Sequence, residues 1–241
     1  MSIAQKLTEI AENVPKVFEA GKKAEYDTFW DSFQQNGNRR QYINGFYSSC
    51  KCWSKANFKP KYDIICEGDT SRCFYAWESL PEGVNIGAIL KEQGVTLDTS
   101  KATNMTAFMA YGYDIIGELP TISFESAGAN TTGALRSVAV TKIEKLIVTE
   151  QTNFSNMFLY CYNLKEIEFE GTVANDKLDL SYSKALSAQS LESVILALST
   201  ETSALTVKLP NTAQATYDAA NGDGAWEALL ATRQNWRFEY A

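Results

Sequence analysis

Four cysteines are the side chains of this sequence best suited to holding a metal ion. They lie within a short span and could supply the four ligands of a tetrahedral structural zinc site: Cys50, Cys52, Cys66 and Cys73. Such sites usually separate paired cysteines by roughly two to four residues, whereas a single residue separates Cys50 from Cys52. With Cys161 the total is five, an odd number that favours reduced thiols over a disulfide framework. We therefore predict buried or unused thiols and no cofactor, and keep an all-cysteine zinc site as the alternative.

Glu166 and Glu168 are the second group that could do chemistry. Two carboxylates can act as the acid and the base or nucleophile of a glycosidase. Here they alternate with Ile167 and Phe169, a pattern typical of the solvent face of a strand. The sequence has no histidine, which excludes Ser-His-Asp and Cys-His catalysis, and it has no phosphate-binding glycine loop or nucleophile elbow. We predict that the protein is not an enzyme, and a glycan-cleaving enzyme is the less favoured alternative.

The charge distribution excludes the usual nucleic-acid footprint. The chain has 22 basic and 29 acidic residues, a net charge of -7, which disfavours the counterion release that drives binding to nucleic acids. Residues 1–65 hold ten basic and seven acidic residues, and the remainder holds twelve and twenty-two. The N-terminal stretch lacks the apolar core of a signal peptide, and no segment is long and apolar enough to cross a bilayer. We expect no nucleic-acid partner, no membrane insertion, and a location in the cytoplasm or in a particle assembled there.

The elements that would position these groups begin with two predicted helices. Apolar residues spaced alternately by four and three form a seam able to join several chains: Ile3, Leu7, Ile10, Val14 and Val17. Pro15 interrupts that helix, so packing of the seam on its own domain remains an equal alternative. A second helix is predicted from an aromatic stripe, which we interpret as core: Tyr26, Phe29, Trp30 and Phe33.

Internal similarity dominates the middle of the chain. Residues 103–112 align with residues 152–161, so that Ala107 meets Asn156. A strand-like pattern follows each of these segments, and a third copy is placed by matching Thr131 to Thr152. The patterns are Leu119, Ile122 and Phe124, then Leu164, Ile167 and Phe169, and in the third copy Ile143, Leu146 and Val148. Units of this kind bury their apolar face only by stacking on neighbours.

The alternation within these strands predicts an inner and an outer face. The apolar residues point inward, and Met and Phe side chains of the connecting segments fill the space behind them. The residues between them face solvent, so we predict that the binding surface includes Lys165, Glu166 and Glu168.

The C-terminal end has the character of a cap. A helical stripe is predicted from Leu191, Val194, Ile195 and Leu198. Further helical packing follows around Tyr217 and Trp226, and the last apolar strand holds Trp236, Phe238 and Tyr240. We interpret the tryptophans as core of a segment that covers the open end of the repeats.

Two segments resemble a known family. Residues 97–105, LDTSKATNM, and residues 156–167, NMFLYCYNLKEI, are similar to the bacterial surface-antigen type of leucine-rich repeat. The resemblance covers roughly 70–210, and it departs from the family pattern at Gly112, where cysteine is usual, and at Gly133. The N-terminal stretch, with AEYDTFWD at 24–31 and FKPKY at 58–62, resembles repeat proteins encoded in phages and prophages of gut Firmicutes. This resemblance implies a tail or virion-associated protein.

These observations predict an α/β protein with a leucine-rich-repeat-like solenoid of short parallel strands, an α-helical N-terminal module and a helical C-terminal cap. The predicted parts are a helical attachment or oligomerisation module over 1–65, a degenerate solenoid over 66–210 and a cap over 211–241. The predicted function is a non-catalytic structural or binding component of a phage or prophage particle, which contacts a host-surface molecule or a neighbouring subunit. A host-encoded adhesion or protein-interaction module is the alternative. The expected partner is a protein or a cell-surface glycan, and the expected assembly is a homo-oligomer, with a trimer favoured by analogy with tail fibres.

Overall fold

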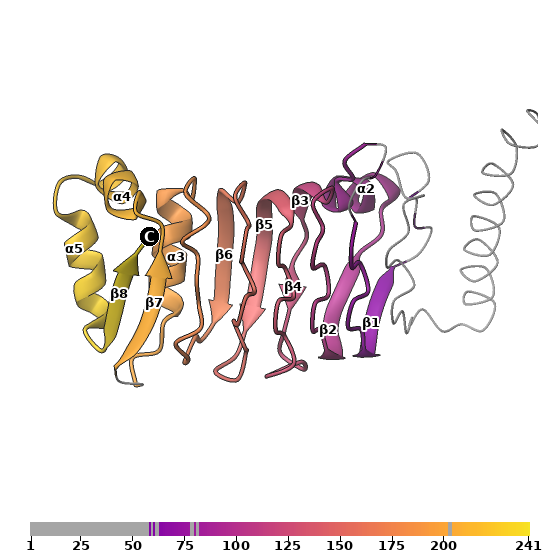
Figure 1. Cartoon of the computed structure of the whole chain (residues 1–241), viewed down its shortest axis with the longest axis horizontal. Helices are drawn as coiled ribbons and strands as arrows, with labels where there is room; N and C mark the ends of the chain where they lie inside the picture. The colour runs from indigo at the N-terminus through magenta and orange to yellow at the C-terminus, as the bar shows by residue number, and fades with distance from the viewer. Residues whose placement is uncertain (1–57, 59, 61–62, 78–79, 81, 202–203) are drawn as a thin grey trace, which may run out of the picture. The chain divides into compact units, whose positions relative to one another are not determined.

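The structure is a computed structural model that describes residues 58, 60, 63–77, 80, 82–201 and 204–241, all of which belong to the unit Gln41–Ala241. Within these residues the chain forms four α-helices and eight strands (Figure 1). Their order is β1 (Ile64–Asp69), α2 (Ile86–Gln93), β2 (Leu97–Asn104), β3 (Ile116–Leu119), β4 (Ile122–Ser123), β5 (Ala139–Val148), β6 (Glu166–Gly171), α3 (Ala188–Ala197), β7 (Leu205–Leu209), α4 (Ala213–Asn221), α5 (Ala225–Leu230), the 3-10 turn η1 (Ala231–Arg233) and β8 (Trp236–Tyr240).

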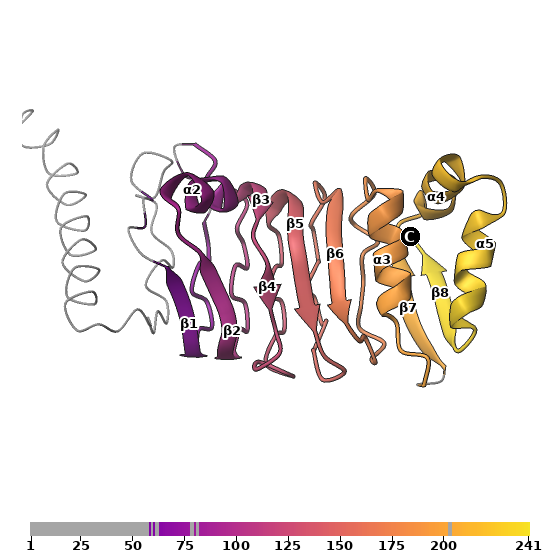
Figure 2. The same ribbon diagram turned by 180° about the vertical axis from the view of Figure 1, so that it is seen from behind.

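All pairings between the described strands are parallel, and they form three separate small sheets (Figures 1 and 2). The first sheet pairs β1 with β2, and the third pairs β7 with β8. In the middle sheet β5 lies between β6 on one side and both β3 and β4 on the other. Pro120 separates β3 from β4 because proline has no N–H to donate to the ladder.

A side chain replaces backbone pairing between the first and middle sheets. The hydroxyl of Thr99 in β2 donates to the carbonyl of Ser123 in β4 at 3.0 Å and accepts from its N–H at 2.7 Å. Thr99 is 2% exposed, so both bonds are shielded from water. The hydroxyl therefore joins the two sheets at the point where their ladder is interrupted.

A helix takes the position of the next strand after β6. The hydroxyls of Ser190 and Ser193 in α3 accept hydrogen bonds from the backbone N–H groups of Ile167 at 2.8 Å and Phe169 at 2.7 Å. Residues three apart lie on one face of a helix, so both hydroxyls meet the same strand. Ser187 caps the helix by accepting from the N–H of Ser190. The middle sheet thus ends against serine hydroxyls.

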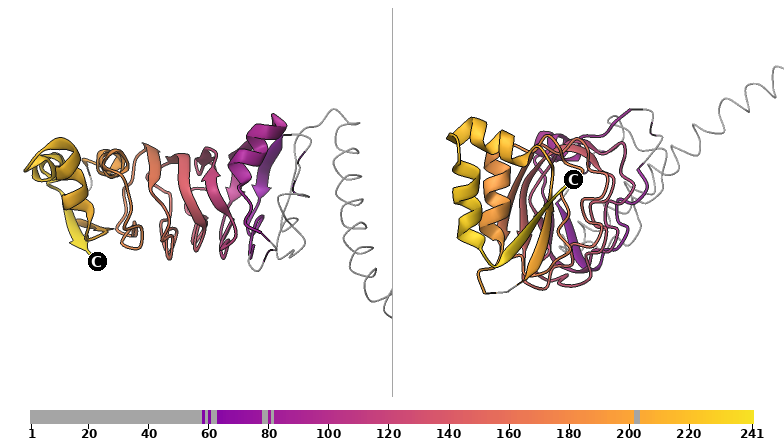
Figure 3. Two further views of the ribbon diagram at one scale, coloured as in Figure 1. Left: turned by 90° about the horizontal axis from the view of Figure 1, so that it is seen from above. Right: turned by 60° about the vertical axis from the view of Figure 1, so that its left-hand side comes forward.

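Behind the sheets, the segments that connect the strands form a second layer (Figure 3). These segments, the arms, cover 70–76, 105–111, 131–137 and 154–160. Neighbouring arms are joined by backbone hydrogen bonds, such as that from Phe74 N–H to Phe108 O at 2.8 Å. Each arm has two residues of left-handed conformation four positions apart: Arg72 and Ala76, Ala107 and Tyr111, Gly133 and Ser137, and Asn156 and Tyr160. The arms therefore share one backbone conformation.

Part of the predicted repeat register is confirmed and part is wrong. Ala107 and Asn156, which the alignment matched, have φ values of 54° and 56°. The third copy was misplaced. Matching Thr131 to Thr152 sets residue 135 against Asn156, whereas the left-handed residue equivalent to Asn156 is Gly133. Its strand was also misplaced, since Ile143 pairs with Ile167 instead of Leu164. The predicted match set the two copies 21 residues apart (131 to 152), whereas the structure sets them 23 apart at Gly133 and Asn156 and 24 apart at Ile143 and Ile167, so counting residues from one turn to the next failed.

The core lies between the sheets and the arms. The predicted inward positions of the strands are buried: Leu119, Ile122, Phe124, Ile143, Leu146, Val148, Leu164, Ile167 and Phe169. So are the predicted filling residues of the arms: Met105, Phe108, Met109, Met157 and Phe158. At the N-terminal end, Phe58, Phe74 and Trp77 pack edge to face with centroid distances between 5.3 and 6.3 Å. Strand alternation thus predicted the core correctly.

The C-terminal end also buries the residues that its patterns predicted. The stripe of α3 is buried: Leu191, Val194, Ile195 and Leu198. Trp226 and Trp236 are 0% and 5% exposed. Their indole N–H groups donate to the hydroxyl of Tyr240 at 3.0 Å and to the carbonyl of Ser199 at 2.8 Å. The tryptophans are therefore core residues whose polar atoms are satisfied, and β8 pairs with β7 across the predicted boundary at 210.

The predicted solenoid fold is wrong in its central feature. A leucine-rich-repeat solenoid would carry one continuous parallel sheet, whereas the described residues form a mixed α/β structure with three small separate sheets. The reason is that a threonine side chain stands between β2 and β4, and a helix stands beside β6. The predicted N-terminal helical seam and aromatic stripe lie outside the described residues. None of the described helices has the length and apolar character needed to cross a membrane.

Candidate functional site

A concave surface runs over β3, β5 and β6 between α2 and α3, and we call it the trough. It consists of three adjoining hollows, of which the first two share Lys142 and Glu144 and the last two share Glu168, Gln189 and Ser193. The charged side chains along it are Lys91, Glu118, Lys142, Glu144, Glu166, Glu168 and Glu192. Side chains from two helices and three strands therefore face one continuous depression.

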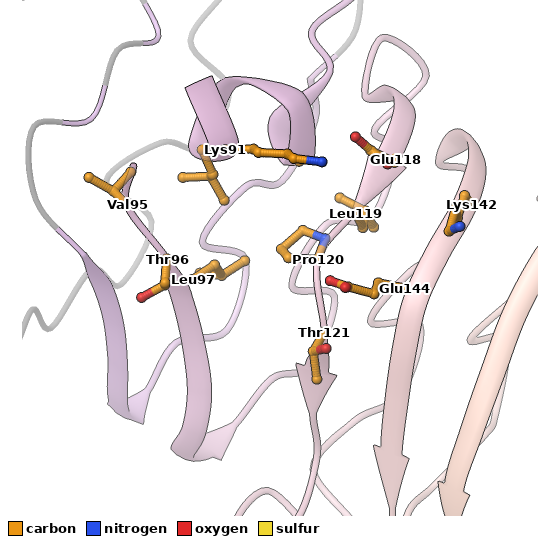
Figure 4. Close-up of a pocket in the computed structure, with 12 residues that line it drawn as sticks. Lys91, Val95, Thr96, Leu97, Glu118, Leu119, Pro120, Thr121, Lys142 and Glu144 are labelled. Atoms are coloured by element: carbon orange, nitrogen blue, oxygen red, sulfur yellow. The ribbon is translucent and has the colours of Figure 1, made fainter. Parts of the chain in front are cut away.

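The largest hollow lies where the first and middle sheets separate (Figure 4). Its volume is about 580 Å³, within the usual range of ligand sites. Val95 and Pro120, both half-buried, contribute apolar surface, while Lys91 extends from α2 toward Glu118 on β3 (Figure 4). Lys142 and Glu144 of β5 lie at its far side (Figure 4). The hollow can therefore hold a chain segment that carries both apolar and charged groups.

Two residues fix α2 against the middle sheet. Asn85 caps the helix by accepting from the N–H of Ala88 at 3.0 Å, and the same oxygen accepts from the N–H of Glu118 in β3 at 3.2 Å. Gly87 allows close approach, because a Cβ atom there would lie 2.6 Å from the carbonyl oxygen of Glu118. The wall of the hollow is thus held directly on the strand that carries Glu118.

Ion pairs connect β5 to β6 in the trough and directly beside it. Lys142 lies 3.0 Å from Glu166, and Lys145 lies 2.7 Å from Glu170 and 3.6 Å from Glu168. The pKa of Lys142 is raised above its usual value by the hydrogen bond and charge of Glu166, and that of Lys145 is raised by Glu170 first and Glu168 next. All these groups are exposed to solvent, so the pairs contribute little to stability. They orient the carboxylates.

The trough is acidic. Five carboxylates and two ammonium groups line it, a local charge of −3. Glu166 engages Lys142, and Glu168 lies 3.6 Å from Lys145, which is not part of the lining. In the strand register Lys142 lies opposite Glu118 on one side and Glu166 on the other, so these three charges alternate in sign across the sheet. Among the described residues, Glu118, Glu144 and Glu192 form no ion pair. A basic group of a partner would therefore find unpaired carboxylates in the trough.

The structure brings two of the three predicted face residues into the trough. Glu166 and Glu168 line it, whereas Lys165 is exposed just before β6 begins and is not part of its lining. The sequence reasoning missed Lys91, Glu118, Lys142 and Glu144. For Lys142 and Glu144 a signal existed, because they flank the buried Ile143 as Glu166 and Glu168 flank Ile167. Nothing in the sequence indicated that α2 would stand beside them.

Cys66, Cys73 and Cys161 are free and buried thiols. Burial raises the pKa of Cys73, with a further contribution from its neighbour Cys66, and raises the pKa of Cys161 to about 12. Cys50 and Cys52, the other members of the alternative zinc site, lie outside the described residues. Among the residues that are described, no group of three or more histidine, cysteine or acidic side chains is arranged to hold a metal ion.

Comparisons with known proteins do not identify the chain. No protein-family model matches it, and neither a curated protein nor a solved structure is significantly similar to it. The resemblance to surface-antigen leucine-rich repeats therefore stays a prediction. The geometry of the trough has to carry the functional argument.

Proposed function

We propose that this protein is a non-catalytic binding component of a phage or prophage particle, and that the trough docks a basic segment of a neighbouring subunit or of a host-surface protein. The observation that carries the docking site is the acidic trough, in which five carboxylates face two lysines. The assignment to a particle is supported by the resemblance of the N-terminal stretch to phage-encoded repeat proteins.

Charge and shape favour a protein segment in the trough. Apolar surface from the half-buried Val95 and Pro120 lies in the same hollow as Lys91 and Glu118. A basic peptide segment has long apolar stems that end in cations, so it can satisfy both kinds of surface. The attraction between exposed charges falls with added salt, and so should the affinity.

The test is recovery of the protein in particles. Particles are purified on density gradients after induction of the strain that encodes the chain, and the protein is detected by immunoblotting. We expect the natural protein in the particle fraction, and at least about a tenfold loss for a Glu144→Lys, Glu168→Lys double variant, since reversal of two charges replaces attraction by repulsion. Glu150→Lys is the matched control, because Glu150 is exposed in the turn after β5 and does not line the trough.

Two results would contradict the proposal. Natural protein found on the cell envelope and not in particles would favour the host-encoded adhesion or interaction module. Retention of the double variant in particles at the level of Glu150→Lys would show that the trough is not the docking surface.

A further inference from the structure

Six tyrosines and two arginines form a stripe over the arms and the chain segments beside them, in the layer behind the sheets. The stripe consists of Arg72, Tyr75, Tyr111, Tyr113, Arg136, Tyr160, Tyr162 and Tyr182. Tyr113, Tyr160 and Tyr162 are 48%, 37% and 61% exposed. The trough does not include any of these residues. The stripe is therefore a second candidate surface.

Contacts between successive arms make the stripe continuous. Tyr75 contacts Tyr111 with ring centroids 5.5 Å apart, and Tyr160 contacts Tyr182 at 5.1 Å. The arm between them carries Arg136, whose guanidinium carbon lies 4.9 Å from the ring centroid of Tyr111 and 5.8 Å from that of Tyr160. Both distances are within cation–π range. Each successive arm thus adds a tyrosine or an arginine to the stripe, and neighbouring arms are about 5 Å apart.

Arg136 is held in place but its donors are not used. Its Nε is buried without a hydrogen-bond partner. By contrast, the guanidinium of Arg233 donates to the carbonyls of Leu198 at 2.8 Å and Leu196 at 2.6 Å. Arg136 as a whole is half-buried, and its two Nη groups form no hydrogen bond with the described residues, so they are available to an acceptor from outside the chain.

The acceptor that fits is anionic. Neither Arg72 nor Arg136 forms an ion pair with another residue of the described chain, although the protein as a whole has a net charge of -7. Lys184, exposed two residues after Tyr182, adds a third positive charge at that end. The planar guanidinium fork matches the two oxygens of a carboxylate.

We infer that the stripe is a binding site for an acidic polysaccharide whose sugar units carry carboxylates. A sugar ring has an apolar face and a hydroxyl-bearing edge, and a tyrosine offers a ring and a hydroxyl to match them. The stripe repeats similar groups from arm to arm, as the polymer repeats its units. Tyrosine and arginine are also enriched at protein interfaces, so binding to a second copy of the chain is one of the outcomes of the test. This site lies apart from the trough, so its test is independent of the proposed docking function.

The experiment measures binding of the full chain to polygalacturonate oligomers by titration calorimetry, with methyl-esterified oligomers as the uncharged counterpart. We expect binding to the acid form and about tenfold weaker binding to the ester. Arg136→Gln should weaken binding about tenfold, as expected for one lost charge-assisted hydrogen bond. Tyr162→Ala, at the most exposed ring of the stripe, should weaken it several-fold with an unchanged melting temperature. Arg237→Gln, an exposed arginine of β8, is the control and should bind as the natural protein does.

Three outcomes would overturn the inference. The first is that the natural protein does not bind the acid form. The second is an equal loss of affinity in Arg237→Gln and Arg136→Gln, which would indicate unspecific charge attraction. The third is self-association that Arg136→Gln abolishes, which would show that the stripe binds the acidic trough of a second copy.

Discussion

Replacement of Thr99 by valine tests how the two sheets beside the largest hollow are joined. Valine has nearly the shape of threonine but lacks the hydroxyl, so Ser123 would lose a partner for both its N–H and its carbonyl. Thr99 and Ser123 are 2% and 6% exposed, so water cannot easily replace that hydroxyl. At about 1–3 kcal/mol for each of the two buried groups left unsatisfied, Thr99→Val should lower the free energy of unfolding by about 2–6 kcal/mol. This is a large part of the stability of an ordinary domain.

The assay is urea unfolding followed by far-UV circular dichroism. With a dependence on urea of about 2 kcal/mol per molar, the midpoint should fall by about 1–3 M. Thr99→Ser keeps the hydroxyl and should retain most of the stability. Thr141→Val is the matched control, because the hydroxyl of Thr141 bonds the carbonyl of Gly117 at an exposed position, where water can replace it. If Thr99→Val changed the midpoint no more than Thr141→Val does, the hydroxyl would not be what joins the sheets.

Four further predictions follow from other contacts. Gly87→Ala should destabilise the protein by about 1–3 kcal/mol, because its Cβ would overlap the carbonyl of Glu118, and thermal unfolding checks this. Ser193→Ala should lower the free energy of unfolding, measured in urea, by about 1–3 kcal/mol, because the N–H of Phe169 loses its acceptor. Ser193→Thr keeps a hydroxyl and should largely preserve the stability. Iodoacetamide at pH 8 should label Cys161 only after unfolding, since burial raises its pKa from 9.0 to about 12. Labelling of the native protein would refute the buried placement of Cys161. As the pH rises above 9, the thiol ionises in the unfolded chain before it ionises in the native protein, so the free energy of unfolding should fall progressively. If the predicted seam joins chains, light scattering should give a trimer for the natural protein and a monomer for a Leu7→Asp, Ile10→Asp variant; a monomer in both would contradict the seam.

Strand alternation and the matched arms could be predicted from the sequence, because both depend on local patterns. The burial of Ile167 and Phe169 and the equivalence of Ala107 with Asn156 follow from such patterns. The arrangement of sheets could not be predicted, because it depends on contacts between residues distant in sequence, such as Thr99 with Ser123. An exposed threonine and a threonine that joins two sheets look alike in the sequence.

The same distinction applies to the candidate sites. The alternation identified Glu166 and Glu168, but α2 completes the trough, and its placement depends on Asn85 reaching Glu118. The stripe was partly visible, since the alignment that matched Ala107 with Asn156 also matches Tyr111 with Tyr160. The role of Arg136 was not visible, because its position between those two rings depends on how the arms stack.

The placement of α3 beside β6 bears on how the protein avoids aggregation. An open strand offers unpaired N–H and carbonyl groups to which a strand of another molecule can add. Along β6 the N–H groups of Ile167 and Phe169 already donate to the hydroxyls of Ser190 and Ser193. The helix that carries these serines has no extended edge to which a further strand could add. The serines of α3 therefore close the middle sheet to intermolecular strand addition on this side, which allows the protein to be kept at high local concentration without forming fibrils through β6.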